Sequence, residues 1–255
     1  MTPWYEETFG RQYLTLYGHR DIDEAEEDIL ALVRLLDPPR DEPLLDLGCG
    51  AGRHLAALKA LGFQRPVGLD LSDELLQVAA RRLADIGPDG VDLIRSDMRT
   101  IPYADHFATI LSLFTSFGYF QADADNRAVL RAVHRALRPD GRFLMDYMNR
   151  QYVIETLVER DERTLPAPGW HVENVRCLTE GCRRVEKTTT ITVQQTGETR
   201  RFHESVRLYA EPELEAMLQA TGFADIETYG ALAGRPYTPA SERLVIIARK
   251  KGAHA

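Results

Sequence analysis

The stretch Leu45-Asp46-Leu47-Gly48-Cys49-Gly50-Ala51-Gly52-Arg53 decides the fold, because an apolar strand-like run enters it and a helical pattern leaves it. A strand that ends in such a glycine loop and leads into a helix brings backbone N–H groups close to a ligand. The nicotinamide fingerprint Gly-X-Gly-X-X-Gly would need its third glycine at position 53, which is Arg53. Because the third glycine comes one residue earlier and Asp46 precedes the loop, the pattern favours a ligand that carries an amino acid group. Carboxylate and carbonyl oxygens can meet the ammonium of such a ligand.

Two further carboxylates follow the next two predicted strands. Asp70 ends the strand predicted over 66–71, 24 residues after Asp46, where it can accept hydrogen bonds from both hydroxyls of a ribose. Asp97 follows the strand predicted over 91–96, where it can accept from an adenine amino group while the Met98 backbone addresses the ring. Three carboxylates at successive strand ends, with a glycine loop at the first, indicate such a ligand far more specifically than any one of these features alone.

Strands and helices alternate through residues 41–160. The predicted strands are 43–47, 66–71, 91–96, 107–113 and 141–147, and the helices between them include 52–61, 73–86 and 124–137. Strands separated by helices of this length form βαβ units and a parallel sheet. The stretches 44–47 and 110–113 are nearly continuous apolar runs, as expected where helices cover both faces of a sheet.

Three segments flank or interrupt this alternating core. Residues 1–40 read as helices, and we expect them to form a lid. Residues 165–209 are rich in Thr, Val, Arg and Glu, with Gly181 and Gly197 as turns, so the sequence predicts an inserted antiparallel β meander. Residues 210–255 hold a helix over 211–221 and two strands, which we expect to complete the domain that 41–160 begins.

Composition narrows the class of protein. The chain has 255 residues, and 31 Lys and Arg against 39 Asp and Glu give a formal charge of −8, which argues against nucleic acid as a partner. Three cysteines are too few for a disulfide framework, and no Cys/His set or carboxylate-rich cation site is apparent, so we expect no metal. The acidic, aromatic N-terminus is unlike a secretory signal, and no apolar run is long enough for a membrane span. A cytoplasmic protein is expected.

The motifs resemble those of class I S-adenosylmethionine-dependent methyltransferases, a likeness that also includes Leu137-Arg138-Pro139-Asp140-Gly141, where the family usually has Pro-Gly-Gly. The resemblance implies a Rossmann-like α/β fold whose seven-stranded sheet is mostly parallel, with the last strand antiparallel. It implies S-adenosylmethionine as the cofactor. The residues expected to bind this cofactor are Asp46, Gly48, Cys49, Gly50, Arg53, Asp70, Leu71, Asp97, Met98, Leu113 and Phe114.

A closer resemblance rests on Leu113-Phe114-Thr115-Ser116-Phe117-Gly118-Tyr119 together with the meander. This combination is similar to small-molecule N-methyltransferases, among them amino-sugar N,N-dimethyltransferases, so transfer to nitrogen is slightly favoured over transfer to oxygen. The candidates for catalysis are Tyr119, Tyr17 and His19, with Tyr119 preferred as the base or polar contact. Further candidates for the acceptor site are Tyr13, Arg20, Phe117, Asp146, Tyr147, Asn149, Arg235 and Arg243.

Two alternative functions stay open at the level of the sequence. Methyl transfer needs no diagnostic catalytic residue, so a module that binds the cofactor without transferring its methyl group fits the same motifs. A nicotinamide-dependent oxidoreductase on a similar sheet is a weaker alternative, because Arg53 occupies the position of the third glycine. A small-molecule acceptor is the expected partner, and the meander could pair at its edge with a second subunit to form a homodimer.

Overall fold

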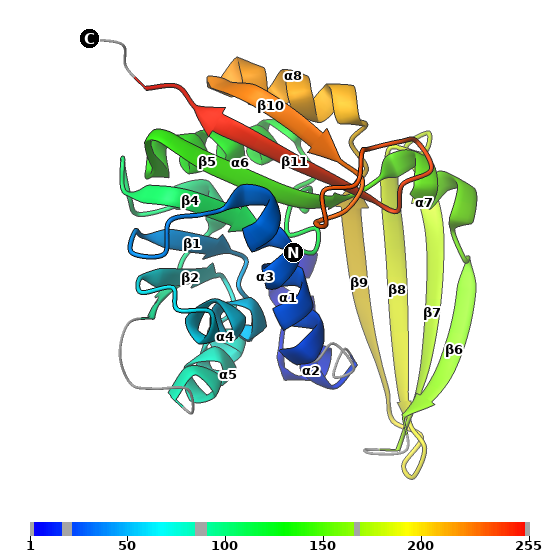
Figure 1. Cartoon of the computed structure of the whole chain (residues 1–255). Coiled ribbons are helices and arrows are strands. Elements are labelled where there is room, and N and C mark those ends of the chain that lie inside the picture. Colours follow the sequence, from blue (N-terminus) through cyan, green and yellow to red (C-terminus); the bar gives the residue numbers. More distant parts are fainter. Residues whose placement is uncertain (1–2, 17–21, 85–90, 166–168, 253–255) are drawn as a thin grey trace.

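A seven-stranded sheet forms the larger part of the molecule in the computed structural model, which describes residues 3–16, 22–84, 91–165 and 169–252 (Figure 1). Its strands, in spatial order, are β10 (Phe223–Tyr229), β11 (Arg243–Lys250), β5 (Leu137–Met148), β4 (Phe107–Ser112), β1 (Leu44–Leu47), β2 (Pro66–Asp70) and β3 (Asp92–Arg95). The strands from β5 to β3 pair in parallel, and β11 runs antiparallel to both of its neighbours. The predicted Rossmann-like α/β class is confirmed.

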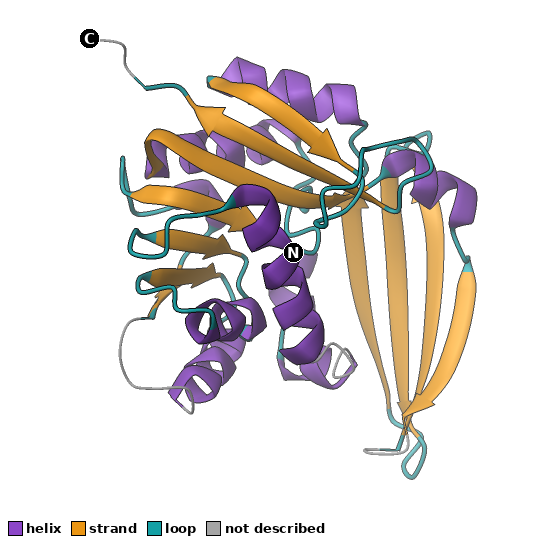
Figure 2. Ribbon diagram, viewed as in Figure 1, coloured by secondary structure: helices purple, strands orange, loops and turns teal. Residues whose placement is uncertain are grey.

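Helices cover both faces of this sheet (Figure 2). One face carries α3 (Ile22–Leu36), α4 (Arg53–Ala60) and α5 (Asp73–Ala84), and the other carries α6 (Asp123–Ala136) and α8 (Glu211–Thr221). Because neighbouring strand residues point to opposite faces, Leu44 packs among the side chains of α3 to α5, and Leu45 among those of α6 and α8. Both leucines are buried, which explains why the strands read as unbroken apolar runs.

A second, four-stranded antiparallel sheet lies beside the first (Figure 1). Its strands, in order, are β6 (Arg160–Leu165), β7 (Trp170–Thr179), β8 (Arg184–Val193) and β9 (Thr199–Arg207). The predicted meander is confirmed, with turns at Gly181 and Gly197 that both have positive φ. The sequence pattern indicates neither β6 nor the short helix α7 (Arg150–Thr156) that precedes it, because β6 consists mostly of charged residues. Pairing of a sheet edge with a second subunit stays a prediction.

Two short N-terminal helices, α1 (Trp4–Thr8) and α2 (Arg11–Leu16), lie between the two sheets (Figure 1). Leu16 packs with Val172 and Ile191 of the second sheet. The hydroxyl of Thr8 donates to the carbonyl oxygen of His203 at 2.9 Å. The N-terminal segment is thus fixed to the second sheet. No helix in the described ranges is long and apolar enough to cross a membrane.

Two buried arginines join the second sheet to the first. Arg207 forms ion pairs with Glu213 at 3.2 Å and Asp123 at 3.4 Å, at the first turns of α8 and α6. Arg184 donates from Nη2 to the carbonyl oxygen of Phe120 at 2.8 Å. Buried charges need such partners, because an unpaired charge away from water is costly. The loop that follows β4 is therefore held from the side of the second sheet.

Candidate active site

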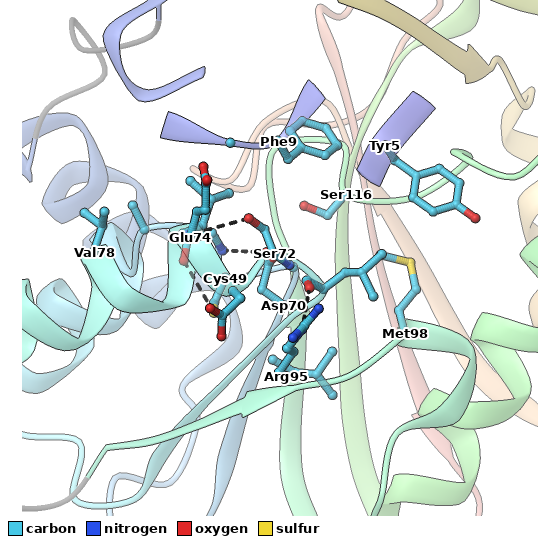
Figure 3. Close-up of a pocket in the computed structure, with 18 of the residues that line it drawn as sticks. Tyr5, Phe9, Cys49, Asp70, Ser72, Glu74, Val78, Arg95, Met98 and Ser116 are labelled. Carbon is cyan, nitrogen blue, oxygen red and sulfur yellow. Dashed lines mark hydrogen bonds between the residues drawn. The ribbon is translucent and has the colours of Figure 1, made fainter. Parts of the chain in front are cut away.

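A cavity of about 1310 Å³ opens at the carboxyl edge of the parallel strands. Its walls come from the N-terminal segment, the glycine loop, the ends of β2 and β3, and the loop after β4. The lining includes Tyr5, Phe9, Gly48, Cys49, Gly50, Arg53, Asp70, Leu71, Asp97, Met98, Leu113, Phe114, Ser116 and Tyr119. Figure 3 shows Tyr5 and Phe9 on one side of this space, with Asp70 and Met98 on another. Ligands of open α/β sheets bind at this edge.

Asp70 closes the glycine loop against the end of β2. Its Oδ2 accepts from the backbone N–H of Gly50 at 2.8 Å, and its Oδ1 accepts from the backbone N–H of Ser72 at 2.8 Å. Burial raises the pKa of Asp70, and these two backbone hydrogen bonds work in the opposite direction. Each carboxylate oxygen keeps a second lone pair for a ligand, so the geometry is compatible with the predicted bond to a ribose.

Asp46 lies behind the glycine loop and is 1% exposed. Its Oδ2 is buried and finds no hydrogen-bond partner among the described residues. Burial raises the pKa of this carboxyl to about 6; His54 lowers it, and Asp70 raises it further. Asp46 is absent from the cavity lining, while Gly48 and Cys49 next to it belong to the lining. A buried carboxylate without a donor is unfavourable by itself, and its negative charge attracts a cationic group to the adjoining wall of the cavity.

Asp97 caps the short 3-10 helix η1 (Met98–Thr100) and pairs with Arg99. It accepts from the Arg99 backbone N–H at 2.8 Å and from the Arg99 guanidinium, whose Nη2 lies 2.6 Å from Oδ2. Burial raises the pKa of Asp97, but the Arg99 hydrogen bonds outweigh burial and hold the pKa below its ordinary value. The sequence does not indicate this ion pair. Recognition of an adenine amino group by Asp97 stays a prediction.

The loop after β4 brings Tyr119 to the cavity but not Phe117. Tyr119 is half-buried, and its ring lies 5.1 Å from that of Trp4 and 5.5 Å from that of Phe9. The Trp4 indole N–H also donates to the Tyr119 carbonyl oxygen at 3.3 Å. Phe117 is 1% exposed in the core beneath α6 and α8, so its proposed place in the acceptor site is wrong.

Several other candidates for the acceptor site lie elsewhere. Tyr17, His19 and Arg20 are outside the described residues, as is the side chain of Tyr13. Asp146 is buried under the loop after β4 and pairs with Arg243 at 2.7 Å. Tyr147 and Asn149 are also buried. Tyr147 donates to the carbonyl of Arg207, and Asn149 donates to the carbonyls of residues 238, 239 and 241 and accepts from the Tyr237 hydroxyl at 3.1 Å. Besides Phe117, five of the described candidates do not line the cavity: Asp146, Tyr147, Asn149, Arg235 and Arg243.

The sequence predicts that the N-terminal segment covers the cavity, but it does not indicate which described residues of that segment line it. Tyr5, Glu6, Glu7 and Phe9 line the cavity, although Tyr5 and Phe9 appeared in the sequence only as helix-like apolar spacing. Tyr5 packs edge-on against Phe120, with ring centroids 5.4 Å apart. The helical spacing of aromatic residues does not indicate which element their rings pack against. Only the tertiary structure shows that they reach the cavity.

Comparison with known proteins explains this arrangement. A family model described as a methyltransferase domain matches residues 44–141. The dTDP-3-amino-3,4,6-trideoxy-alpha-D-glucopyranose N,N-dimethyltransferase of Streptomyces venezuelae is 31% identical over 169 residues, which cover 63% of this chain and 68% of that enzyme. The chain belongs to the S-adenosylmethionine-dependent methyltransferases. The nicotinamide alternative has no support among these matches.

Two other methyltransferases extend the likeness. The dTDP-3-amino-3,6-dideoxy-alpha-D-glucopyranose N,N-dimethyltransferase of Streptomyces fradiae is 35% identical over 122 residues, 48% of this chain. The chain spans about half the length of that relative, namely 45%. The S-adenosylmethionine-bound amino pentose methyltransferase CalS10 of Micromonospora echinaspora is 25% identical, with a TM-score of 0.65 over 94% of this chain and 97% of that one.

The cavity of this methyltransferase fits the family's cofactor, S-adenosylmethionine. The unpartnered oxygen of Asp46 suits the ammonium of the methionine part, and Asp70 can accept from ribose hydroxyls. Ligand pockets usually measure roughly 300 to 1000 Å³. At about 1310 Å³, this cavity has room for the cofactor and an acceptor together.

A substitution at Gly48 tests the assignment of this cavity to S-adenosylmethionine. A Cβ at this position would lie 2.9 Å from both Cβ and Oγ of Ser116, and the φ of +80° disfavours any side chain. We expect Gly48→Ala to weaken S-adenosylmethionine binding about tenfold in calorimetry, because the loop must shift by a few tenths of an ångström. Gly181→Ala is the matched control, because its φ is +66° and its Cβ would meet nothing within 4 Å. Equal cofactor affinity in both variants would contradict the assignment.

Proposed function

We propose that this protein transfers the methyl group of S-adenosylmethionine to the amine of a small amino sugar. The observation that carries the proposal is one cavity in which strand-end carboxylates and a glycine loop face the aromatic side chains of the N-terminal segment and Tyr119. Support for the acceptor class comes from three relatives named as amino-sugar N,N-dimethyltransferases, which are 31% to 35% identical over parts of this chain.

We also propose that residues 1–40 act as a lid over the acceptor side of the cavity. Trp4, Phe9 and Tyr119 form one aromatic contact group, and Tyr5 packs on Phe120. These rings lie between the cavity and the second sheet. The division into a cofactor-binding domain (41–160 and 210–255) and a β insertion (165–209) follows from the same proposal.

When bound, the cofactor would supply a methyl group on a positively charged sulfur. The amine nitrogen of the acceptor would form a bond to the methyl carbon as the carbon–sulfur bond breaks and leaves its electron pair on sulfur, and the resulting ammonium would release its proton to solvent. An in-line displacement of this kind depends mostly on holding the reacting atoms in line in a dry site. Phe9, Tyr119 and Phe120 give the cavity an apolar aromatic wall, and Tyr119 offers a hydroxyl that can accept from the amine.

Transfer to an amino sugar tests the proposed function. The protein is incubated with S-adenosylmethionine and a dTDP-linked 3-amino-3,6-dideoxy sugar, and products are separated and weighed by mass spectrometry. The proposal predicts products with one and then two added methyl groups, and no product from the matched sugar that carries a hydroxyl in place of the amine. Binding of the cofactor without any methylated amine, across a panel of amino sugars, would refute it.

Tyr119→Phe tests the acceptor side of the cavity. We expect kcat to fall about tenfold to a hundredfold, because the variant loses the hydroxyl that accepts from the amine and orients its lone pair. The affinity for S-adenosylmethionine should change little, since the ring and its contacts with Trp4 and Phe9 remain. Tyr103→Phe is the control, because that tyrosine stacks on His106 outside the cavity lining. A kcat equal to that of the control would remove Tyr119 from the mechanism.

A further inference from the structure

Two consecutive residues after β4 hold a backbone conformation that side chains disfavour. Phe114 has a φ of +57° and Thr115 a φ of +61°, both in the left-handed region. That region is unfavourable for residues with a Cβ and especially for a β-branched residue such as Thr115. A conformation of this kind persists only where surrounding contacts impose it, and it is typical of functional sites.

Asp146 and Arg243 supply those contacts from the two neighbouring strands, β5 and β11. The Asp146 carboxylate accepts from the Phe114 backbone N–H at 3.0 Å, and the Asp146 carbonyl accepts from the Thr115 backbone N–H at 3.0 Å. Arg243 Nε donates to Asp146 Oδ1 at 2.7 Å, and its Nη2 donates to the Thr115 hydroxyl at 3.0 Å. Asp146 is 4% exposed, so its carboxylate depends on these donors.

The left-handed turn places two side chains against the glycine loop. The Phe114 ring lies under the Arg53 guanidinium, 4.5 Å from its carbon to the ring centroid, with Arg243 5.8 Å away. Ser116 follows and fills the space beside Gly48. Phe114, Ser116 and Arg53 all line the cavity, whereas Asp146 and Arg243 do not. The strained turn therefore connects an ion pair that does not line the cavity to the wall of the cofactor site.

We propose that Asp146 and Arg243 are positioning residues, which hold the Phe114–Thr115 turn in the conformation that shapes the cofactor side of the cavity. The effect on S-adenosylmethionine binding rests on the proposed function. The effect on the conformation of the turn does not depend on that function. Arg243 thus acts through the loop and not through contact with an acidic acceptor. The fork of its guanidinium is essential, because one group must reach both Asp146 and the Thr115 hydroxyl.

The test combines a disruption with a rescue. In Arg243→Gln the turn loses its ion pair, and we expect S-adenosylmethionine to bind about tenfold more weakly in calorimetry. Adding Thr115→Gly should restore most of that affinity, because glycine adopts positive φ without strain. Arg249→Gln is the matched control on the same strand, since Arg249 pairs with Asp140 at 2.7 Å away from the cavity. It should bind the cofactor as the wild type does.

Hydrogen exchange at the Phe114 and Thr115 amides separates this inference from the proposed function. Faster exchange in Arg243→Gln than in Arg249→Gln, without the cofactor, supports the positioning role even if wild-type protein binds no S-adenosylmethionine. Three results would each overturn it: unchanged exchange in Arg243→Gln, unchanged cofactor affinity in that variant beside a binding wild type, or a double variant that regains thermal stability but not affinity.

Discussion

Replacing Asp70 by alanine is expected to weaken S-adenosylmethionine binding about a hundredfold or more, because hydrogen bonds to a charged group contribute roughly 1.5 to 3 kcal/mol each. Asp70 is predicted to accept from two ribose hydroxyls, and it also holds the backbone N–H groups of Gly50 and Ser72 at 2.8 Å. The variant loses both functions. Calorimetric titration with S-adenosylmethionine measures the change.

Asp92→Ala is the control for this prediction. Asp92 is exposed at the opposite end of the sheet, paired in register with Val67 on β2, and it does not line the cavity. Its loss should leave the affinity within about twofold of the wild type, as for most surface substitutions. If Asp70→Ala bound the cofactor as tightly as this control, the ribose assignment would be wrong.

Asp46 predicts how cofactor binding depends on pH. Its carboxyl has a pKa of about 6 in the structure, so it is charged at about pH 7.5 and mostly protonated at about pH 5. Only the charged form attracts an ammonium. We expect affinity for S-adenosylmethionine to fall about tenfold from pH 7.5 to pH 5, because protonation removes the negative charge behind the glycine loop that attracts the ammonium. Calorimetry at a series of pH values follows the change.

Asp46→Asn is the variant that isolates this effect. It should bind S-adenosylmethionine about ten- to a hundredfold more weakly at neutral pH, and lose most of the change near pH 6. The affinity of Asp70→Asn should be weak as well but keep that change. A wild-type affinity that stays constant from pH 7.5 to 5 would contradict the role of Asp46.

The Asp46 carboxyl should affect the stability of the ligand-free protein in the opposite direction to cofactor affinity, so that stability falls as the pH rises. Its folded pKa of about 6 exceeds the ordinary value of 3.8, so the folded state binds the proton more tightly than the unfolded state does. Its stabilising contribution is therefore fully present below about pH 4 and is lost as the pH rises through about 6; the difference is about 3 kcal/mol. A buried carboxylate that costs stability at neutral pH is consistent with a site whose ligand is cationic.

The cofactor half of the site was predictable from the sequence because local motifs encode it. The glycine loop needs backbone conformations that Gly48, Gly50 and Gly52 allow, and Asp70 and Asp97 follow their strands directly. Strand ends of a parallel sheet meet at one edge, so linear spacing sufficed to bring these groups together. The alternation of strands and helices likewise predicted a parallel sheet, whose seven strands the family resemblance implied.

The acceptor half was not predictable, because it depends on contacts between distant segments. Tyr5 and Phe9 reach the cavity only because α1 packs against the second sheet, through the bond from Thr8 to His203. Asp146 and Arg243 looked like ligand-binding residues at strand ends, but their partners are each other and a strained turn. No periodicity in the sequence indicates that Phe114 and Thr115 take positive φ.

A crystal structure with S-adenosylhomocysteine bound is the most direct test of the central claim, that this cavity holds the cofactor through its strand-end carboxylates. We predict the ribose hydroxyls on Asp70, the amino group against Gly48 and Cys49 in front of Asp46, and the sulfur facing the side of the cavity that Ser116 and Tyr119 line. A ligand bound elsewhere, or one that leaves Asp70 in contact with Gly50 and Ser72 alone, would contradict the account.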